Sequence, residues 1–321
     1  RERTGIPQIE FIFKHQLTQE AVYQSLLRRK RRTLHRRVAQ AIEEREADQL
    51  GGRPELLAHH WERAGDAARA VHYLQRAGER AAGKYANNEA AAYFTRALAL
   101  IPKDDHDHRF DLLLAREQVY DLQGDRERQS QDLYALKRLT EADDRHEQGI
   151  ARHRAKLFLR EANYYREISR YPAAEAAAKQ AIIWAERASD ILIQAKGHLM
   201  WGRVTGTLAS HKEQRTRFER SLALARAAGE KSIEAESQRE LGISYAVTGN
   251  HIAKRTHLRA ALKTYRQIGD RMGEGRTLGA LGSNPGSEED IDRCEQFIRQ
   301  ALQIHRETGN RWEETWQLIF L

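Results

Sequence analysis

A dense run of cations near the beginning of the chain is the feature best suited to binding chemistry. It reads Arg28-Arg29-Lys30-Arg31-Arg32 and is followed by Arg36-Arg37. Cations at this density attract phosphates, so the run is compatible with a nucleic acid or an anionic membrane surface. It is also compatible with a solvated helix face or with contact to an acidic neighbouring domain, and we favour these two interpretations.

Metal-binding side chains are grouped once, in the polar loop that contains Asp105, His106 and His108. Adjacent loop residues without a rigid shell of partners rarely hold a metal ion, so we expect a solvated loop and no metal site. Gly229-Glu230-Lys231-Ser232 ends like a phosphate-binding loop but lacks the upstream glycine and the preceding strand. Hydrolase and metalloprotease motifs are missing as well. We therefore expect no catalytic residues and no cofactor in this chain.

Composition narrows the class of protein. The 321 residues carry a net charge of +8 and a single cysteine, Cys294, which favours a reducing, cytoplasmic location. No apolar run approaches the roughly 18–20 residues that span a bilayer, so no membrane partner is expected. The chain begins with Arg1 rather than Met and has no signal peptide, which indicates a fragment of a longer polypeptide.

The elements that position these side chains are predicted to be helices, because Ala, Leu, Arg and Glu are abundant and prolines number only five. From Ser189 to Asn310 one pattern returns every 40 residues: Ser189-Asp190, Gly229-Glu230, Gly269-Asp270 and Gly309-Asn310. We interpret these pairs as helix ends followed by helix caps. Self-similarity at this period predicts stacked helical units that form a solenoid.

Two ladders of small residues have the same step. They are Ala162, Gly202, Gly242 and Gly282, and Ala181, Ser221, Ala261 and Ala301. Small side chains let two backbones approach, so both ladders are expected where paired helices cross. Phe218, Leu258 and Ile298 are expected to fill the seam between hairpins. Earlier in the chain, Gly65-Asp66 and Asn87-Asn88 are predicted to be breaks between helices.

A known repeat shares these features. Gly78, Ala90, Phe94, Ala97 and Pro102 have its spacing of small, alanine, aromatic, alanine and proline residues. With the ladders, residues 54–321 resemble the tetratricopeptide repeat (TPR), in a long form of about 40 residues. The resemblance implies an all-α fold, a right-handed superhelical solenoid of helix-turn-helix repeats over residues 51–321. It is looser around residues 103–150.

In this family, the first helix of each pair lines the concave surface. Carried over to this sequence, the inward positions with a peptide-binding or protein-binding role are Lys156, Asn163, Arg166, Lys196, Arg203 and Arg239. The resemblance therefore implies a basic groove with apolar spots, suited to an acidic or C-terminal peptide. Met200 stands where a full two-carboxylate clamp would need an arginine.

The pattern of residues 1–50 differs from that of the repeats and predicts a short strand at Ile9–Phe13 followed by two helices. Phe11–Leu17, Glu20–Tyr23 and Leu34–Ala39 resemble the end of the winged-helix segment in STAND-type signalling ATPases. The closest variety is the ATPase-plus-repeat region of multidomain bacterial adenylate/guanylate cyclases. In that class a nucleotide-binding domain precedes the winged helix, and a repeat sensor follows it. Gly51-Gly52-Arg53-Pro54 reads as the linker.

His15 stands where that class often places a histidine against the phosphate of the bound nucleotide. An imidazole N–H can donate to a phosphate oxygen, so the resemblance implies nucleotide sensing by His15 in a parent protein. A histidine that caps the next helix or packs under Tyr23 is the alternative. Gln16 replaces the aspartate that is usual after this histidine in part of the class.

These features lead us to expect a non-catalytic interaction and regulatory sensor module of a signalling ATPase, of cyclase or transcription-regulator type. Its partners would be a peptide, protein or small ligand in the groove, and the upstream nucleotide-binding domain of the same polypeptide. The alternative is a nucleic-acid-associated transcriptional regulator that uses residues 28–37. An enzyme with its active site in the groove is the third hypothesis, and only the missing motifs argue against it.

Overall fold

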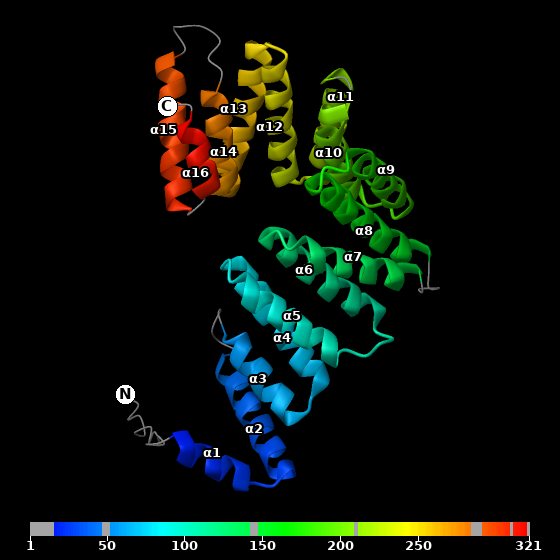
Figure 1. Ribbon diagram of the computed structural model, residues 1–321, viewed down its shortest axis with the longest axis vertical. Coiled ribbons are helices and arrows are strands. Elements are labelled where there is room, and N and C mark those ends of the chain that lie inside the picture. The colour runs from blue at the N-terminus through cyan, green and yellow to red at the C-terminus, as the bar shows by residue number, and fades with distance from the viewer. Residues whose placement is uncertain are drawn as a thin grey trace, which may run out of the picture. The chain divides into compact units, whose positions relative to one another are not determined.

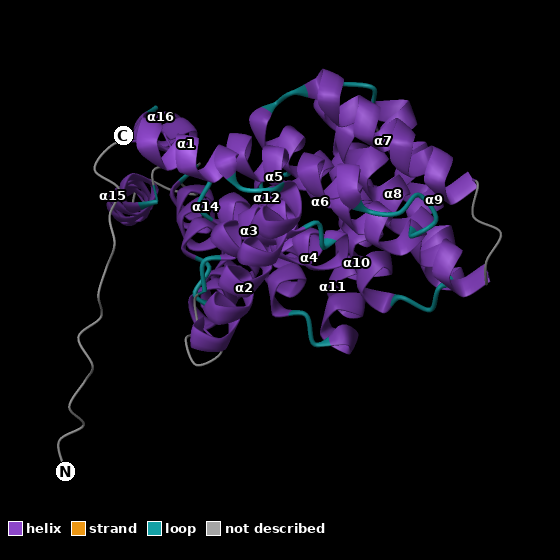
Figure 2. Ribbon diagram, turned by 90° about the horizontal axis from the view of Figure 1, so that it is seen from below, coloured by secondary structure: helices purple, strands orange, loops and turns teal. Residues whose placement is uncertain are grey.

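The structure, a computed structural model, describes residues 16–46, 52–141, 147–208, 211–283, 291–308 and 311–319. All regular secondary structure in these ranges is helical, and loops join the helices (Figure 2). The helices cluster into two compact units, Arg1–Asp132 and Leu133–Leu321. The predicted strand at Ile9–Phe13 lies outside the described residues, and the predicted division between residues 50 and 51 stays a prediction.

The first unit contains the early helices of Figure 1 and the beginning of α7. They are α1 (Gln16–Ser25), α2 (Arg28–Glu46), α3 (Pro54–Ala64), α4 (Ala67–Gly83), α5 (Asn87–Leu100), α6 (His106–Gln123) and α7 (Arg126–Glu141). From α2 to α6, each helix packs on the next one in the sequence. Most helix contacts in this unit are therefore made between sequence neighbours, and α4 also contacts α6.

The second unit contains the rest of α7 and nine further helices within the described residues. They are α8 (Glu147–Glu167), α9 (Tyr171–Arg187), α10 (Ile191–Leu208), α11 (His211–Ala228), α12 (Lys231–Val247), α13 (His251–Ile268), α14 (Arg271–Gly282), α15 (Ile291–Glu307) and α16 (Arg311–Leu318). Each even-numbered helix from α8 to α14 forms a hairpin with the following odd-numbered one, and the hairpins stack in chain order (Figure 1). The predicted all-α stack of TPR-like helical repeats is confirmed.

Three members of the 40-residue ladder of helix ends are present in the structure, and the fourth, Gly309-Asn310, lies outside the described residues. Ser189, Gly229 and Gly269 all have left-handed backbone conformations, with φ of 53°, 72° and 72°. A glycine tolerates this conformation without a Cβ clash, which explains its place at two of the three ends. An aspartate caps the next helix in two of the three copies: Oδ1 of Asp190 accepts from the Ile193 amide at 2.9 Å, and Oδ1 of Asp270 from the Gly273 amide at 2.8 Å. The predicted cap at Glu230 is wrong, because its side chain makes no capping hydrogen bond. The chain thus ends one helix and begins the next within two residues.

The first ladder of small residues provides space for a large side chain from the paired helix. A Cβ added to Gly202 would lie 2.4 Å from Cε1 of Phe218. The same relation joins Gly242 to Leu258 and Gly282 to Ile298, each with a hypothetical contact under 3 Å. These large residues therefore lie over the small residue of their own hairpin, where the sequence had suggested the seam between hairpins. The 16-residue offset is the same in all three copies.

The second ladder lies fully inside the core. Ala181, Ser221, Ala261 and Ala301 are all 0% exposed. Ser221 is the polar member, and its hydroxyl donates to the carbonyl oxygen of Ala195 at 2.8 Å. Its Oγ also lies 2.9 Å from Oγ of Ser237 on α12. The hydroxyl at this buried position is thus satisfied by both neighbouring helices.

One predicted break is displaced. Asn87 and Asn88 do not separate two helices, because α5 already begins at Asn87. No side chain caps the beginning of α5. The break lies at Tyr85, which has φ of 59°. The Ala86 amide donates to the carbonyl oxygen of Ala81 at 3.0 Å, and this hydrogen bond closes the end of α4. Backbone hydrogen bonding therefore places the left-handed residue on a tyrosine that sequence preference would not select.

A half-buried histidine of the second unit has a strongly lowered pKa. His198 of α10 stacks on Trp201, with ring centroids 6.3 Å apart and an interplanar angle of 14°. Burial, together with the charges of Arg217 and Arg220, lowers the pKa of His198 to about 4. In the unfolded chain this pKa returns to its ordinary value of 6.5. Between these two pH values the unfolded chain binds a proton that the folded chain does not, so acid favours unfolding.

We expect the stability of the second unit to fall as pH decreases from about 6.5 towards about 4, and His198→Gln to reduce this dependence. Urea unfolding at a series of pH values, compared between wild type and variant, measures it. His257 has a lowered pKa too, so the informative quantity is the difference between the two curves. Parallel curves would show that His198 is protonated equally in both states.

Candidate interaction surface

The predicted binding residues lie on three of the first helices in their hairpins. Lys156, Asn163 and Arg166 are on α8, Lys196 and Arg203 are on α10, and Arg239 is on α12. Contacts join α8 to α10, α10 to α12 and α12 to α14, although these helices are separated in sequence by a whole helix. We call these four helices the A row. The structure therefore places all six residues on one continuous row of helices.

Two arginines of the A row, Arg203 and Arg239, contact glutamates of α12. Arg203 reaches from α10 to α12, where its Nη2 donates to Oε1 of Glu236 at 2.6 Å and its Nε to Oε1 of Glu240 at 3.1 Å. Nη2 of Arg239 donates to the same Glu240 oxygen at 2.7 Å. On α8, Nη2 of Arg166 donates to Oδ1 of Asn163 at 3.2 Å. Two of the five predicted cations thus share one carboxylate.

This cluster is charged and largely shielded from water. The side chains of Arg203 and Glu240 are 24% and 14% exposed. Burial raises the pKa of the Glu240 carboxyl, but the charges of Arg239 and Arg203 outweigh it and hold that pKa below its usual range. Burial opposes the charge on Arg203 in the same way, and the carboxylates of Glu240 and Glu236 raise its pKa. The ion pairs are therefore fully formed at neutral pH.

Arg203 consequently ties α10 to α12, and Arg239, which is itself on α12, shares the Glu240 oxygen with it. Both guanidinium groups are thus already bound to a carboxylate. Two described cations of the A row, Lys196 and Arg276, occupy the same place in their repeats, 80 residues apart. Nε of Arg276 is buried and has no hydrogen-bond partner. Within the described residues neither side chain forms an ion pair. These two cations have capacity left for an external acceptor.

Sequence reasoning missed Glu240 and Arg276. Glu240 stands in the repeat position that Met200 has on α10, so the register gives no sign of a carboxylate there. Glu240 accepts hydrogen bonds from Arg203 because the Arg203 side chain is long enough to reach the next repeat. Arg276 could have been found, because it is the next member of the series Lys156, Lys196 and Glu236.

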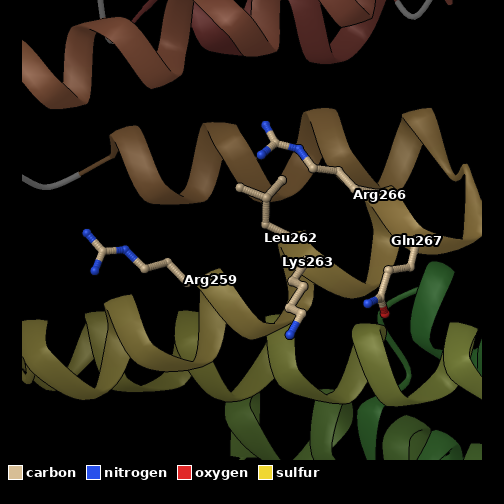
Figure 3. Close-up of a pocket in the computed structure, with 5 residues that line it drawn as sticks. All are labelled: Arg259, Leu262, Lys263, Arg266 and Gln267. Atoms are coloured by element: carbon tan, nitrogen blue, oxygen red, sulfur yellow. The ribbon is translucent and has the colours of Figure 1, made fainter.

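A separate basic hollow lies along α13. Its volume is about 530 Å³, and it is lined by Arg259, Leu262, Lys263, Arg266 and Gln267. Figure 3 shows that all five side chains project from this single helix. Nε of Arg266 already donates to Oε1 of Glu274 at 2.8 Å. Because one helix supplies the whole lining, no second element positions groups opposite these cations, and the hollow lacks the convergent polar groups of a specific site.

The remaining sequence candidates are placed as follows. His15 lies outside the described residues. Asp105 caps α6 by accepting from the His108 amide, and its carboxylate lies 2.8 Å from Nδ1 of His108. This hydrogen bond and the aspartate charge raise the pKa of His108. In the part of the chain that the structure describes, no three His, Cys, Asp or Glu residues are grouped to hold a metal ion. None of the described helices has the length and apolarity needed to cross a membrane.

The fold is shared with helical-repeat proteins of known structure. A STAND protein with a tetratricopeptide repeat sensor, PH0952 from Pyrococcus horikoshii, has a TM-score of 0.59 and 12% identity; the match covers 95% of this chain and 49% of that one. The apo form of RapI has a TM-score of 0.57 and 12% identity, over 77% of this chain and 94% of that one. BtubC from P. vanneervenii has a TM-score of 0.50 and 13% identity, over 76% and 93%. At such identities the likeness shows the TPR-like fold.

Sequence comparison is less informative. No family model matches the chain. Uncharacterized protein R02095 of Rhizobium meliloti (strain 1021) is 35% identical over 88 residues, which make up 27% of this chain and 9% of that relative. The matched part of this chain thus spans less than a tenth of the relative.

Proposed function

We propose that this chain is a non-catalytic regulatory module that binds an acidic peptide segment of a partner protein along the A row. The observation that carries the proposal is the pair of unpaired cations, Lys196 and Arg276, on a row of helices held in register by the Arg203 cluster. Helix faces that are continuous over several repeats are the surfaces with which solenoid proteins bind extended partners. Lys156, Asn163 and Arg166 would extend the binding face along α8.

The sensor role in a signalling ATPase is part of the same proposal. It is supported by the likeness to the STAND protein with a repeat sensor, which covers nearly all of this chain and about half of that one. We infer that an upstream nucleotide-binding domain of cyclase or transcription-regulator type belongs to the same polypeptide and is regulated by the repeats. A cytoplasmic location fits the single cysteine, Cys294.

The mechanism that we infer is a population shift. A peptide that contacts Lys196 on α10 and Arg276 on α14 would interact with three successive hairpins at once. It would therefore bind more tightly to one packing of those hairpins than to another. Such a preference changes the equilibrium between two arrangements of the repeats, and the neighbouring domain can respond to that change.

Anisotropy of a fluorescein-labelled decaglutamate peptide tests the binding face. We expect the double variant Lys196→Glu/Arg276→Glu to weaken binding about tenfold or more, because each reversal replaces an attraction with a repulsion. The matched control is Lys263→Glu/Arg259→Glu, which reverses two charges in the hollow on α13. This control should retain most of the affinity.

Equal losses in both double variants would contradict the proposal, since binding would then follow total charge. Unchanged binding in Lys196→Glu/Arg276→Glu would place the peptide elsewhere. Arg203 and Arg239 are unsuitable for this test, because substituting Arg203 breaks the contact between α10 and α12, and substituting Arg239 removes one partner of the shared Glu240 carboxylate.

A further inference from the structure

Three arginines of the basic run face a pocket in the first unit. The pocket has a volume of about 220 Å³, with Tyr23 of α1 as one wall. Its other lining residues are Arg28, Arg31 and Arg32 of α2 and Glu62 and Arg63 of α3. Four guanidinium groups from two helices thus line one small space, which we call the arginine pocket.

The carboxylates of the described residues leave most of this charge uncompensated. Glu62 is the acid in the lining, and it already accepts from Arg96 of α5, whose Nε lies 3.2 Å from Oε1 of Glu62. Within the described residues, none of the four pocket arginines forms an ion pair. Nη1 of Arg31 donates to Oε1 of Gln24 at 3.2 Å, but its buried Nε has no partner. The pocket therefore contains donors and positive charge in excess.

Histidines behind the tyrosine wall do not contribute to this charge. Oη of Tyr23 lies 3.0 Å from Nε2 of His35, and Nδ1 of His35 lies 2.9 Å from Nδ1 of His60. Burial lowers the pKa of His35, and the charges of His59 and Arg63 lower it further. Burial and the charge of Arg63 also lower the pKa of His59. These imidazoles are therefore neutral at physiological pH, and the positive charge around the pocket comes from the arginines.

Like charges at close range repel one another, and a bound oxyanion relieves that repulsion. Guanidinium groups bind phosphate oxygens through two parallel N–H donors, which makes arginine the preferred residue for this purpose. The first turn of α2, which begins at Arg28, adds the positive end of a helix dipole.

The volume of the arginine pocket limits the size of the ligand that it can hold. At about 220 Å³ the pocket is smaller than the roughly 300–1,000 Å³ of sites for drug-sized molecules. It is large enough for phosphate groups and too small for a complete nucleotide. We propose that the arginine pocket binds the phosphate groups of a small phosphorylated molecule. This site lies in the first unit and is independent of the peptide surface on the A row.

Isothermal titration calorimetry of the whole chain with inorganic pyrophosphate tests the proposal. We expect saturable binding at one site, and a loss of affinity of about tenfold or more in Arg31→Gln/Arg63→Gln, because two of the four phosphate-binding forks are removed. The matched control is Arg36→Gln/Arg37→Gln, which removes the same charge from exposed positions of α2. Its affinity should change by less than about twofold.

Separate titrations with inorganic phosphate and ATP distinguish the sources of the ligand. Equal affinities for ATP and pyrophosphate would show that only phosphates are bound, and tighter binding of ATP would show contacts beyond them. Both results support the site. If circular dichroism shows that Arg31→Gln/Arg63→Gln is unfolded, Arg32→Gln replaces it, with an expected loss of about threefold.

Two results would overturn the proposal. The first is an absence of saturable pyrophosphate binding. The second is an equal loss of affinity in Arg31→Gln/Arg63→Gln and in the Arg36→Gln/Arg37→Gln control. If duplex DNA then binds, loses affinity equally in both variants and is not displaced by pyrophosphate, the basic run is a nucleic-acid surface instead.

Discussion

Glu240→Ala is expected to destabilise the packing of α10 against α12 by about 3 kcal/mol, because it leaves two guanidinium groups without a shared acceptor. Arg203 keeps Glu236, but the Arg239 side chain is only 15% exposed and loses the carboxylate at 2.7 Å. Removing one partner of a shielded ion pair costs more than the pair contributes, since the remaining charge is poorly solvated. Native-state hydrogen exchange of α10 and α12 amides should show protection reduced by about two powers of ten.

The control is Glu213→Ala, which removes a carboxylate that pairs with Arg217 at 3.4 Å and is 44% exposed. Exposed pairs of this kind contribute little, so the expected cost is below about 0.5 kcal/mol. Acid gives a second check. Because the folded pKa of Glu240 is depressed, its contribution is present above its ordinary pKa and is lost as pH falls through the folded pKa. Similar costs for both substitutions would mean that Glu240 is well solvated.

Gly202→Ala and Gly149→Ala are expected to change stability in opposite directions. The methyl group at position 202 would lie 2.4 Å from Cε1 of Phe218, a residue that is 0% exposed and has no space to move. Overpacking of this kind costs about 2 kcal/mol. At Gly149 on α8, no atom lies within 4 Å of an added Cβ. There the substitution should stabilise the helix by up to about 1 kcal/mol, because alanine has the higher helix propensity.

Urea unfolding monitored by circular dichroism measures both variants. Phe218→Leu should partly rescue Gly202→Ala, since the smaller side chain leaves room for the methyl group. If both glycine substitutions were stabilising, α10 and α11 would have to move apart at little cost. That result would contradict the close contact between Gly202 and Phe218.

The sequence predicts the repeat architecture well because the ladders report local geometry. Gly202 and Ser221 recur every 40 residues since each hairpin must repeat the same close contacts, and Gly269-Asp270 encodes a turn that depends on two residues alone. The displaced break at Tyr85 shows the limit. There the hydrogen bond from Ala86 to Ala81 decides which residue becomes left-handed, and that bond depends on where α4 ends.

The candidate sites were less predictable for a different physical reason. A repeat register tells which positions face the A row, but it does not tell how far a side chain reaches into the next repeat. Arg203 was predicted as a ligand-binding cation, and its partner Glu240 lies 37 residues away on another helix. Arg63 joins the arginine pocket from outside the basic run in the same way. Long side chains on neighbouring helices create pairings that spacing alone does not encode.

The hydroxyl pair of Ser221 and Ser237 distinguishes the junction between α11 and α12 from the other junctions of the array. Repeat arrays evolve by duplication of whole units, and a copy inserted after α11 would place Ser221 against the position that Gly197 has on α10. Gly197 has no hydroxyl, so Ser221 would keep its bond to Ala195 and lose the one at 2.9 Å. The junction between α11 and α12 therefore distinguishes its correct neighbour from a duplicated one. A duplicated unit inserted at this junction would thus lose one buried hydrogen bond, which contributes about 1 kcal/mol.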